Sequence, residues 1–162
     1  RANLSTWDKS FYDWGEMAVG PENGFYRLTK YDTGKAGIVV APIAPRFAGR
    51  IWVVVGPDNS SATFEFAQAV QLRKIGTLVG EPTGGNQRGI NGGAFFFMTL
   101  PGSGIELDVP LIAQFPETPM PDAGLLPDLT AYASADSIAA GRDVTLEAIF
   151  ARIDRAASAP RR

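Results

Sequence analysis

Runs of apolar residues, interrupted by glycine and proline, divide this chain into predicted strands and helices. Residues 51–55 are β-branched or aromatic without alternation, which is typical of a parallel strand covered on both faces. Between residues 62 and 75 the apolar positions recur at helical spacing, which predicts a helix ended by Gly76. Residues 77–79 predict a short buried strand. Strand, helix and strand in this order indicate an α/β fold.

A second group of elements follows these. Residues 94–100 and 105–112 predict two strands, joined as a hairpin by a turn at 101–104. The prolines in residues 116–127 predict a long surface loop. Residues 143–155 predict a terminal amphipathic helix. The predicted inward face of this helix carries Val144, Leu146, Ile149, Phe150 and Ile153.

We expect the first 49 residues to be an irregular lead-in segment with short strands. Up to residue 24 we expect irregular or briefly helical structure, because aromatic and polar residues mix there without a sustained period. Residues 25–31 are strand-like, a turn follows at 31–34, and Pro42 makes the apolar run 38–43 an edge strand or an extended link.

Length and composition fit one globular domain. The chain has 162 residues, of which 45% are hydrophobic and 20% charged, and we expect the domain at residues 50–155 with a disordered tail at 156–162. The net charge of −2 argues against a nucleic-acid surface. The chain has no cysteine, which excludes disulfides and a thiolate nucleophile, and no apolar run long enough for a membrane helix. Because it begins with Arg1, we expect it to be a processed or excised piece of a longer protein.

Candidate chemistry lies where the first strand meets the first helix. Ser60 and Ser61 occupy that turn, and a glycine-rich loop with Gly84 and Gly85 follows the next strand. Parallel strands carry both turns at one sheet edge, so a serine nucleophile and the loop can face one substrate. The alternative is that the serines only cap the helix. Nucleotide binding is disfavoured, because no Gly-Lys-Ser/Thr follows the glycines.

Several motifs resemble the tail-specific (carboxy-terminal-processing) serine peptidases. Their Val-Gly-Glu-x-Thr-x-Gly loop matches a run that starts at Val79, and their middle serine then falls on Ser61. Asn86 stands where the family has its general-base lysine, which weakens the case for a serine–lysine mechanism. Three further segments resemble family motifs in the family's order, namely LPGSGIELDVPLIAQF (100–115), GLLPDL (124–129) and GRDVTLEAI (141–149).

The resemblance implies a fold, a reaction and a set of site residues. The fold is the C-terminal half of a crotonase/Clp-like spiral of ββα units. The reaction is peptide hydrolysis, by an endopeptidase or a carboxy-terminal-processing peptidase, through an acyl-enzyme on Ser61. Ala62, at the start of the helix, supplies a backbone oxyanion donor, and Gly84 and Gly85 bind substrate.

The general base is expected outside this chain, because the sequence has no histidine and Asn86 cannot accept a proton. A tricorn-like branch of the family pairs serine with an upstream histidine and a downstream acid, for which Glu117 and Asp122 are candidates here. We therefore expect the isolated chain to be inactive.

The expected partners are a peptide or protein substrate and the N-terminal half of the catalytic domain, with a homo-oligomer left open. We expect no cofactor and no metal site, since histidine and cysteine are absent and the aspartates are scattered. The resemblance implies a periplasmic, cell-envelope or secreted location. Two other functions stay open, a non-catalytic peptide-binding or scaffold relative and a crotonase-like acyl-CoA enzyme.

Overall fold

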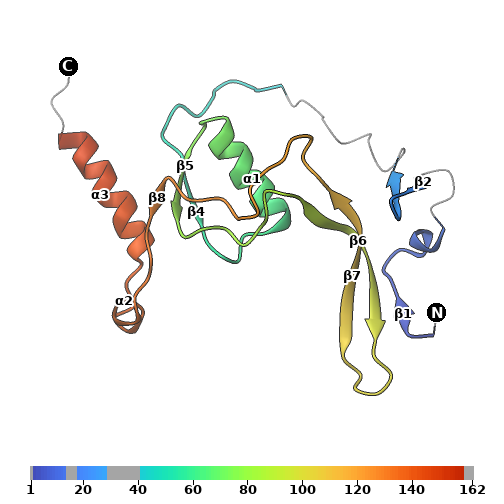
Figure 1. Ribbon diagram of the computed structural model, residues 1–162. Coiled ribbons are helices and arrows are strands. Elements are labelled where there is room, and N and C mark those ends of the chain that lie inside the picture. The colour runs from blue at the N-terminus through green and yellow to red at the C-terminus, as the bar shows by residue number, and fades with distance from the viewer. Residues whose placement is uncertain (1, 14–17, 29–40, 159–162) are drawn as a thin grey trace. The chain divides into compact units, whose positions relative to one another are not determined.

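The computed structural model describes residues 2–13, 18–28 and 41–158, and it shows mixed α and β structure (Figure 1). Two compact units are present, one within Arg1–Ala48 and Gly92–Ile112, the other within Gly49–Asn91 and Ala113–Arg162. The elements in chain order are β1 (Leu4–Ser5), the 3-10 helix η1 (Lys9–Tyr12), β2 (Ala18–Glu22), β3 (Phe25–Leu28), β4 (Trp52–Val55), α1 (Ser61–Leu72), β5 (Thr77–Gly80), β6 (Ile90–Thr99), β7 (Glu106–Gln114), β8 (Leu129–Thr130), α2 (Ala135–Ala139) and α3 (Val144–Ser158).

Antiparallel pairing organises the first unit. β6 lies between β1 and β7, and β2 pairs with β3. The predicted hairpin is confirmed, and the N–H of Leu100 donates to the carbonyl of Ile105 (2.8 Å) beside its turn. Both strands are longer than predicted, because β6 begins at Ile90 and β7 extends to Gln114.

Aromatic side chains pack on both faces of β6. The ring of Trp7 lies 5.5 Å from that of Phe95 and 5.3 Å from that of Phe97, between ring centroids. Tyr12 instead packs against Phe96, at 4.9 Å. This alternation is expected of a strand, in which successive side chains point to opposite faces. The three phenylalanines are half-buried.

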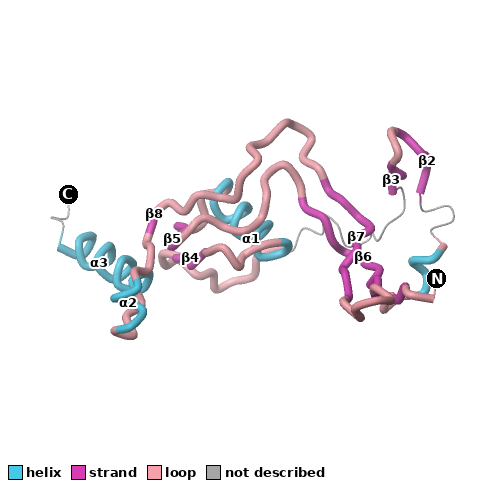
Figure 2. The backbone as a smooth tube through the Cα atoms, turned by 60° about the horizontal axis from the view of Figure 1, so that its bottom comes forward, coloured by secondary structure: helices cyan, strands magenta, loops and turns pink. Residues whose placement is uncertain are grey.

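A parallel sheet forms the centre of the second unit. β5 lies between β4 and β8 and runs parallel to both, with Val55 opposite Gly80 and Val79 opposite Leu129. Figures 1 and 2 both show α1 on one side of this sheet and α3 on the other. The predicted strand, helix and strand are confirmed, and the parallel pairing brings the carboxyl ends of β4 and β5 to one edge.

The core of this unit lies between α1 and the sheet. Phe64, Ala67 and Val70 recur along one face of α1 and are almost fully buried. They pack with residues of β4, β5 and the loop before β8, which are Val55, Leu78 and Leu125. Burial of Phe64 alone stabilises the fold by roughly 1.5–3 kcal/mol.

The second face of the sheet is less covered than the sequence predicts. Val54 is 53% exposed, so the expectation that residues 51–55 are buried on both faces is wrong. In α3 only Ile149 is buried, whereas Leu146, Phe150 and Ile153 of the predicted inward face are exposed. The helical period correctly gathers these apolar residues on one stripe, but in the described residues the sheet covers only part of that stripe.

Element ends also differ from the prediction. α1 ends at Leu72 rather than Ile75, because Lys74 has a left-handed backbone (φ 53°) and the N–H of Ile75 turns back to Val70. The short helix α2 was missed, since its capping box joins two serines, Ser134 and Ser137, instead of a serine and a glutamate.

The predictions for the lead-in are tested only in part. β3 confirms strand structure at the start of residues 25–31, whereas β2 was not expected. Residues 41–43 are not a strand. The predicted turn at 31–34 and residues 38–40 lie outside the described residues. No helix in the described ranges has the length and apolarity to cross a bilayer.

The proline-rich loop is confirmed over residues 116–127 and is fastened to the second unit by hydrogen bonds. The buried Thr83 accepts at Oγ1 from the N–H of Leu125 (2.8 Å) and donates its own N–H to the Leu125 carbonyl (3.0 Å). Asp128 accepts from the N–H of the buried Leu78 (2.7 Å). These bonds hold the loop against the carboxyl edge of the sheet.

Replacing Thr83 by valine keeps the shape of the side chain but removes the oxygen that accepts from Leu125. Because a buried N–H then has no partner, we expect the free energy of unfolding to fall by about 1–3 kcal/mol. Urea unfolding measures this change.

The control Thr130→Val makes the same chemical change at an exposed strand position. Its expected effect is within about 0.5 kcal/mol. Equal losses in both variants would mean that the Thr83 hydroxyl does not hold the loop.

Candidate active site

Ser61 is the first residue of α1 and lies just after a sharp turn that follows β4. Asn59 closes this turn, since its N–H donates to the carbonyl of Gly56 (3.0 Å) and its Oδ1 accepts from the N–H of Gly56 (2.8 Å). Ser61 is exposed and has a left-handed backbone (φ 51°), which costs a residue other than glycine roughly 1–2 kcal/mol. Backbone strain of this kind persists where surrounding contacts enforce it, and strained residues are common at functional sites.

The start of α1 leaves a backbone donor next to this serine. Ser60 is at the N-cap, but its side chain makes no capping hydrogen bond. Its carbonyl instead accepts from the N–H groups of Thr63 and Phe64, at 3.2 and 3.4 Å. Within the described part of the chain, the N–H of Ala62 has no acceptor. The alternative that either serine only caps the helix is therefore disfavoured. The N–H of Ala62 remains an open donor at the N-terminal end of α1, where the helix dipole is positive.

The glycine-rich loop is attached directly to the serine turn. The N–H groups of Gly84 and Gly85 both donate to the carbonyl of Asn59, at 3.1 and 3.2 Å. A Cβ atom on Gly84 would overlap the carbonyl of Pro57, and one on Gly85 would overlap the ring of Phe64. The two turns therefore lie at the same sheet edge, as the sequence predicts, and glycine is required for their close approach.

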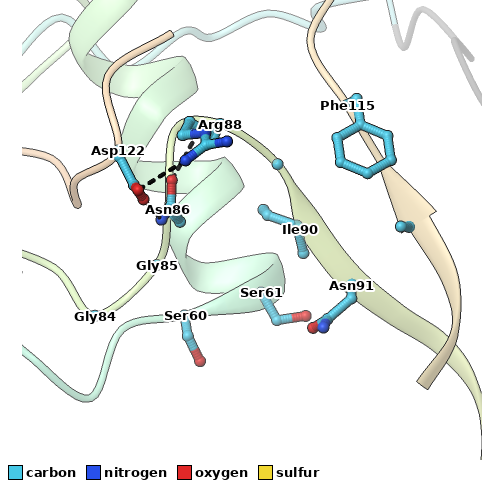
Figure 3. Close-up of a pocket in the computed structure, with 12 residues that line it drawn as sticks. Ser60, Ser61, Gly84, Gly85, Asn86, Arg88, Ile90, Asn91, Phe115 and Asp122 are labelled. Atoms are coloured by element: carbon cyan, nitrogen blue, oxygen red, sulfur yellow. Dashed lines mark hydrogen bonds and ion pairs between the residues drawn. The ribbon is translucent and has the colours of Figure 1, made fainter. Parts of the chain in front are cut away.

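A cavity of about 600 Å³ opens between these turns and the segments that follow. Figure 3 shows its lining: the two serines, the glycine loop, the start of β6 and the end of β7. The lining residues are Ser60, Ser61, Gly84, Gly85, Asn86, Arg88, Gly89, Ile90, Asn91, Ala113, Phe115 and Asp122. All belong to the second unit.

A polar cluster lines one side of the cavity. Asn86 donates from Nδ2 to Asp122 (2.6 Å) and accepts at Oδ1 from the N–H of Arg88 (2.8 Å). Arg88 forms an ion pair with the same carboxylate (2.8 Å). The hydrogen bond from Asn86, followed by the hydrogen bond and charge of Arg88, lowers the pKa of Asp122 below its usual 3.8.

The structure thus brings together all but one of the predicted site residues. Ser61, the glycines, Asn86 and Asp122 line one cavity, and Ala62 follows the serine. Glu117, the other candidate acid, is exposed and does not line the cavity.

The cavity supplies a hydroxyl, backbone donors and a paired carboxylate. The chain has no histidine, and no lysine is among the described residues that line the cavity. Asp122 is a poor general base at neutral pH, because a carboxylate with a lowered pKa binds protons weakly. In the described ranges, no group of three or more His, Cys, Asp or Glu side chains is placed to hold a metal ion.

Sequence reasoning missed several lining and supporting residues. Asn59 was missed, although asparagine in a loop between strand and helix is a common turn residue. Arg88, Asn91 and Phe115 were missed because their place in the cavity depends on how three separate segments meet.

The comparison with known proteins agrees with this geometry. The sequence model of peptidase family S41 matches residues 10–113, which include β4, α1, β5, β6 and most of β7. No curated protein matches the chain.

The Asp122 cluster gives a prediction about pH. We expect the Asp122 carboxyl to titrate below 3.8 and the Asn86→Ala substitution to raise its pKa, because the hydrogen bond that Asn86 donates stabilises the ionised carboxylate. The stabilisation is complete above the unfolded-state pKa and is lost as the pH falls through the lowered folded-state value. NMR titration of the side-chain carboxyl measures both values.

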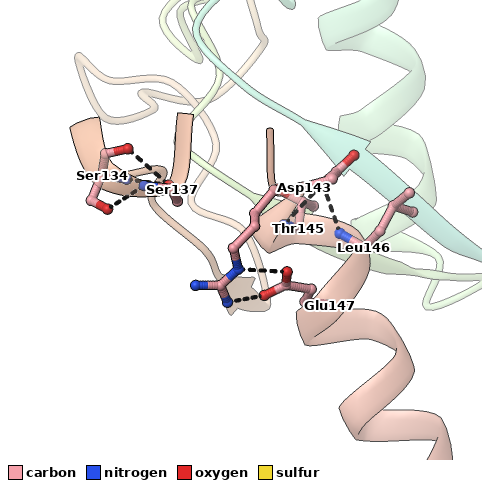
Figure 4. Close-up of polar contacts among 7 residues, drawn as sticks. Ser134, Ser137, Asp143, Thr145, Leu146 and Glu147 are labelled. Atoms are coloured by element: carbon pink, nitrogen blue, oxygen red, sulfur yellow. Dashed lines mark hydrogen bonds and ion pairs between the residues drawn. The ribbon is translucent and has the colours of Figure 1, made fainter. Parts of the chain in front are cut away.

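Arg142→Ala is the control for this titration. Arg142 is paired with Glu147 rather than with Asp122, and its guanidinium lowers the pKa of Glu147 (Figure 4). We expect this substitution to raise the pKa of Glu147 and leave Asp122 unchanged. An Asp122 pKa that stays the same after Asn86→Ala would contradict the role given to that hydrogen bond.

Proposed function

Because the chain belongs to peptidase family S41, we propose that it forms the part of a serine peptidase that presents the nucleophile, Ser61. The family gives the reaction class, hydrolysis of peptide bonds. The serine mechanism rests on the position of Ser61, strained and exposed in a cavity beside the open N–H of Ala62. That single observation carries the proposal.

In the proposed reaction, Ser61 Oγ attacks the carbonyl carbon of the scissile peptide bond. An Oγ–C bond forms, the π electron pair moves to the carbonyl oxygen, and the Oγ proton passes to a general base. Collapse of the tetrahedral intermediate breaks the C–N bond, and the amine leaves with that proton. Water then hydrolyses the acyl-enzyme by the same sequence of steps.

The N–H of Ala62 stabilises the negative oxygen in this scheme. It follows the nucleophile directly and lies in the first turn of α1, where the helix dipole favours negative charge. Because it has no acceptor among the described residues, it is free to meet the oxyanion without breaking an existing bond.

The general base in this proposal is an imidazole or amine from outside these residues. Asp122 then acts as the acid that orients the base or the substrate, since it lines the cavity and Glu117 does not. Its lowered pKa keeps it ionised for that role. The fold we propose for the whole catalytic domain is a crotonase/Clp-like spiral of ββα units, in which β4 and α1 belong to one unit and β5 to the next.

A second function is a peptide-binding relative that has lost catalysis. Its support is Asn86, which stands where the family has a lysine and whose amide is bonded on both sides. Such a protein would keep the cavity and the two turns but leave Ser61 unreactive.

A fluorophosphonate probe separates the two functions in the full-length protein. The peptidase proposal predicts covalent labelling of Ser61, because an activated serine displaces fluoride from phosphorus. Ser61→Ala should abolish labelling, and mass spectrometry of the labelled peptide identifies the site.

Ser60→Ala is the matched control, because Ser60 is the neighbouring exposed serine of the same cavity. We expect this variant to be labelled like the wild type. A folded full-length protein that takes up no probe would support the peptide-binding alternative, and labelling of Ser60 would overturn the assignment of Ser61.

A further inference from the structure

The side-chain amide of Asn91 lies in the cavity without a hydrogen-bond partner among the described residues. Asn91, the second residue of β6, is exposed and lines the same cavity as Ser61. In Figure 3 the side chains of Ser61 and Asn91 point toward one another across the cavity. Within the described residues, the Asn91 side chain makes no hydrogen bond to protein, so its donors are available to a ligand.

The backbone before Asn91 fixes where this amide lies. Gly89 has φ 156°, and a Cβ atom there would come within 2.6 Å of the carbonyl oxygen of Gln114 at the end of β7. Glycine therefore lets the chain enter β6 close to β7. Residues 90 and 91, which follow directly, line the cavity wall.

Apart from the two serine hydroxyls, the other side-chain donors of the cavity are already engaged. Asn86 donates to Asp122, and its Oδ1 accepts from the backbone of Arg88. The guanidinium of Arg88 is paired with Asp122. Among the described residues that line the cavity, Asn91 has the side-chain amide that can donate to a ligand without first breaking a hydrogen bond to protein.

Stabilisation of a tetrahedral oxyanion generally uses more than one donor, and Ala62 supplies one here. We propose that Asn91 Nδ2 supplies another hydrogen bond to the oxygen that becomes negative when Ser61 attacks. This inference rests on the proposed serine peptidase function. The amide suits the role because it is a neutral donor and its carbonyl cannot take the proton from Ser61.

The test measures how fast a fluorophosphonate reacts with Ser61 in the full-length protein. In that reaction an Oγ–P bond forms, fluoride leaves, and the imidazole or amine base takes the Oγ proton. The phosphoryl oxygen occupies the oxyanion position. We expect Asn91→Ala to lower the second-order rate constant roughly 100-fold, the loss typical of one missing oxyanion donor.

Two further variants separate the donor from other roles of the side chain. Asn91→Asp keeps the size but replaces the donor by a negative oxygen, so we expect a loss at least as large as in Asn91→Ala. Gln114→Ala removes an exposed amide from the neighbouring strand that does not line the cavity, and it should react like the wild type. With a peptide substrate, Asn91→Ala should lower kcat with little change in KM.

The outcomes distinguish this inference from the function on which it rests. If the wild type labels at Ser61 and both Asn91 variants label equally fast, Asn91 is not an oxyanion donor and the peptidase function stands. If Asn91→Ala mainly raises KM, the amide binds substrate in the ground state, and the inference is wrong. If the wild type is not labelled at Ser61, the peptidase function and this inference both fail.

Discussion

Two backbone hydrogen bonds, from the N–H groups of Gly84 and Gly85 to the carbonyl of Asn59, determine the geometry of the site. Parallel pairing brings the ends of β4 and β5 together, but the ladder stops where Val55 lies opposite Gly80. Beyond that point the two loops need a contact of their own. A side chain at either glycine would displace one loop from the other, and Ser61 would then no longer share a cavity with the polar cluster.

The same edge also holds a segment that is distant in sequence. Thr83 bonds both backbone groups of Leu125, and Asp128 accepts from Leu78 inside the sheet. These bonds bring the proline-rich loop over the glycine loop and deliver Asp122 to Asn86, from which it is separated by 36 positions. Asp122, the acid of the proposed mechanism, is thus positioned by hydrogen bonds of the buried Thr83 and Leu78 that lie outside the cavity.

The sequence predicts the parts of this arrangement that follow from local periodicity. The strand at residues 52–55, the core face of α1 and the meeting of the two turns could be foreseen, because apolar spacing and glycine reflect strong local constraints. The contact between Asn86 and Asp122 could not, since it depends on how two loops fold over one another. The position of Asn91 was hidden because Gly92 and Gly93 break the strand pattern, so that β6 was expected to begin at Ala94. The exposed stripe of α3 shows a further limit, because periodicity identifies an apolar face but not what covers it.

The charges of the cavity bear on the activation of Ser61 that the proposed mechanism requires. Arg88 is neutralised by Asp122, so its charge is largely offset before it can favour an alkoxide at Ser61. The carboxylate, in turn, is held ionised by Asn86 and Arg88 and has little tendency to take a proton. Neither member of the pair can therefore activate the hydroxyl by itself. In the proposed mechanism, the described cavity holds the nucleophile and receives the negative charge of the substrate, and proton removal needs a separate group with a higher proton affinity.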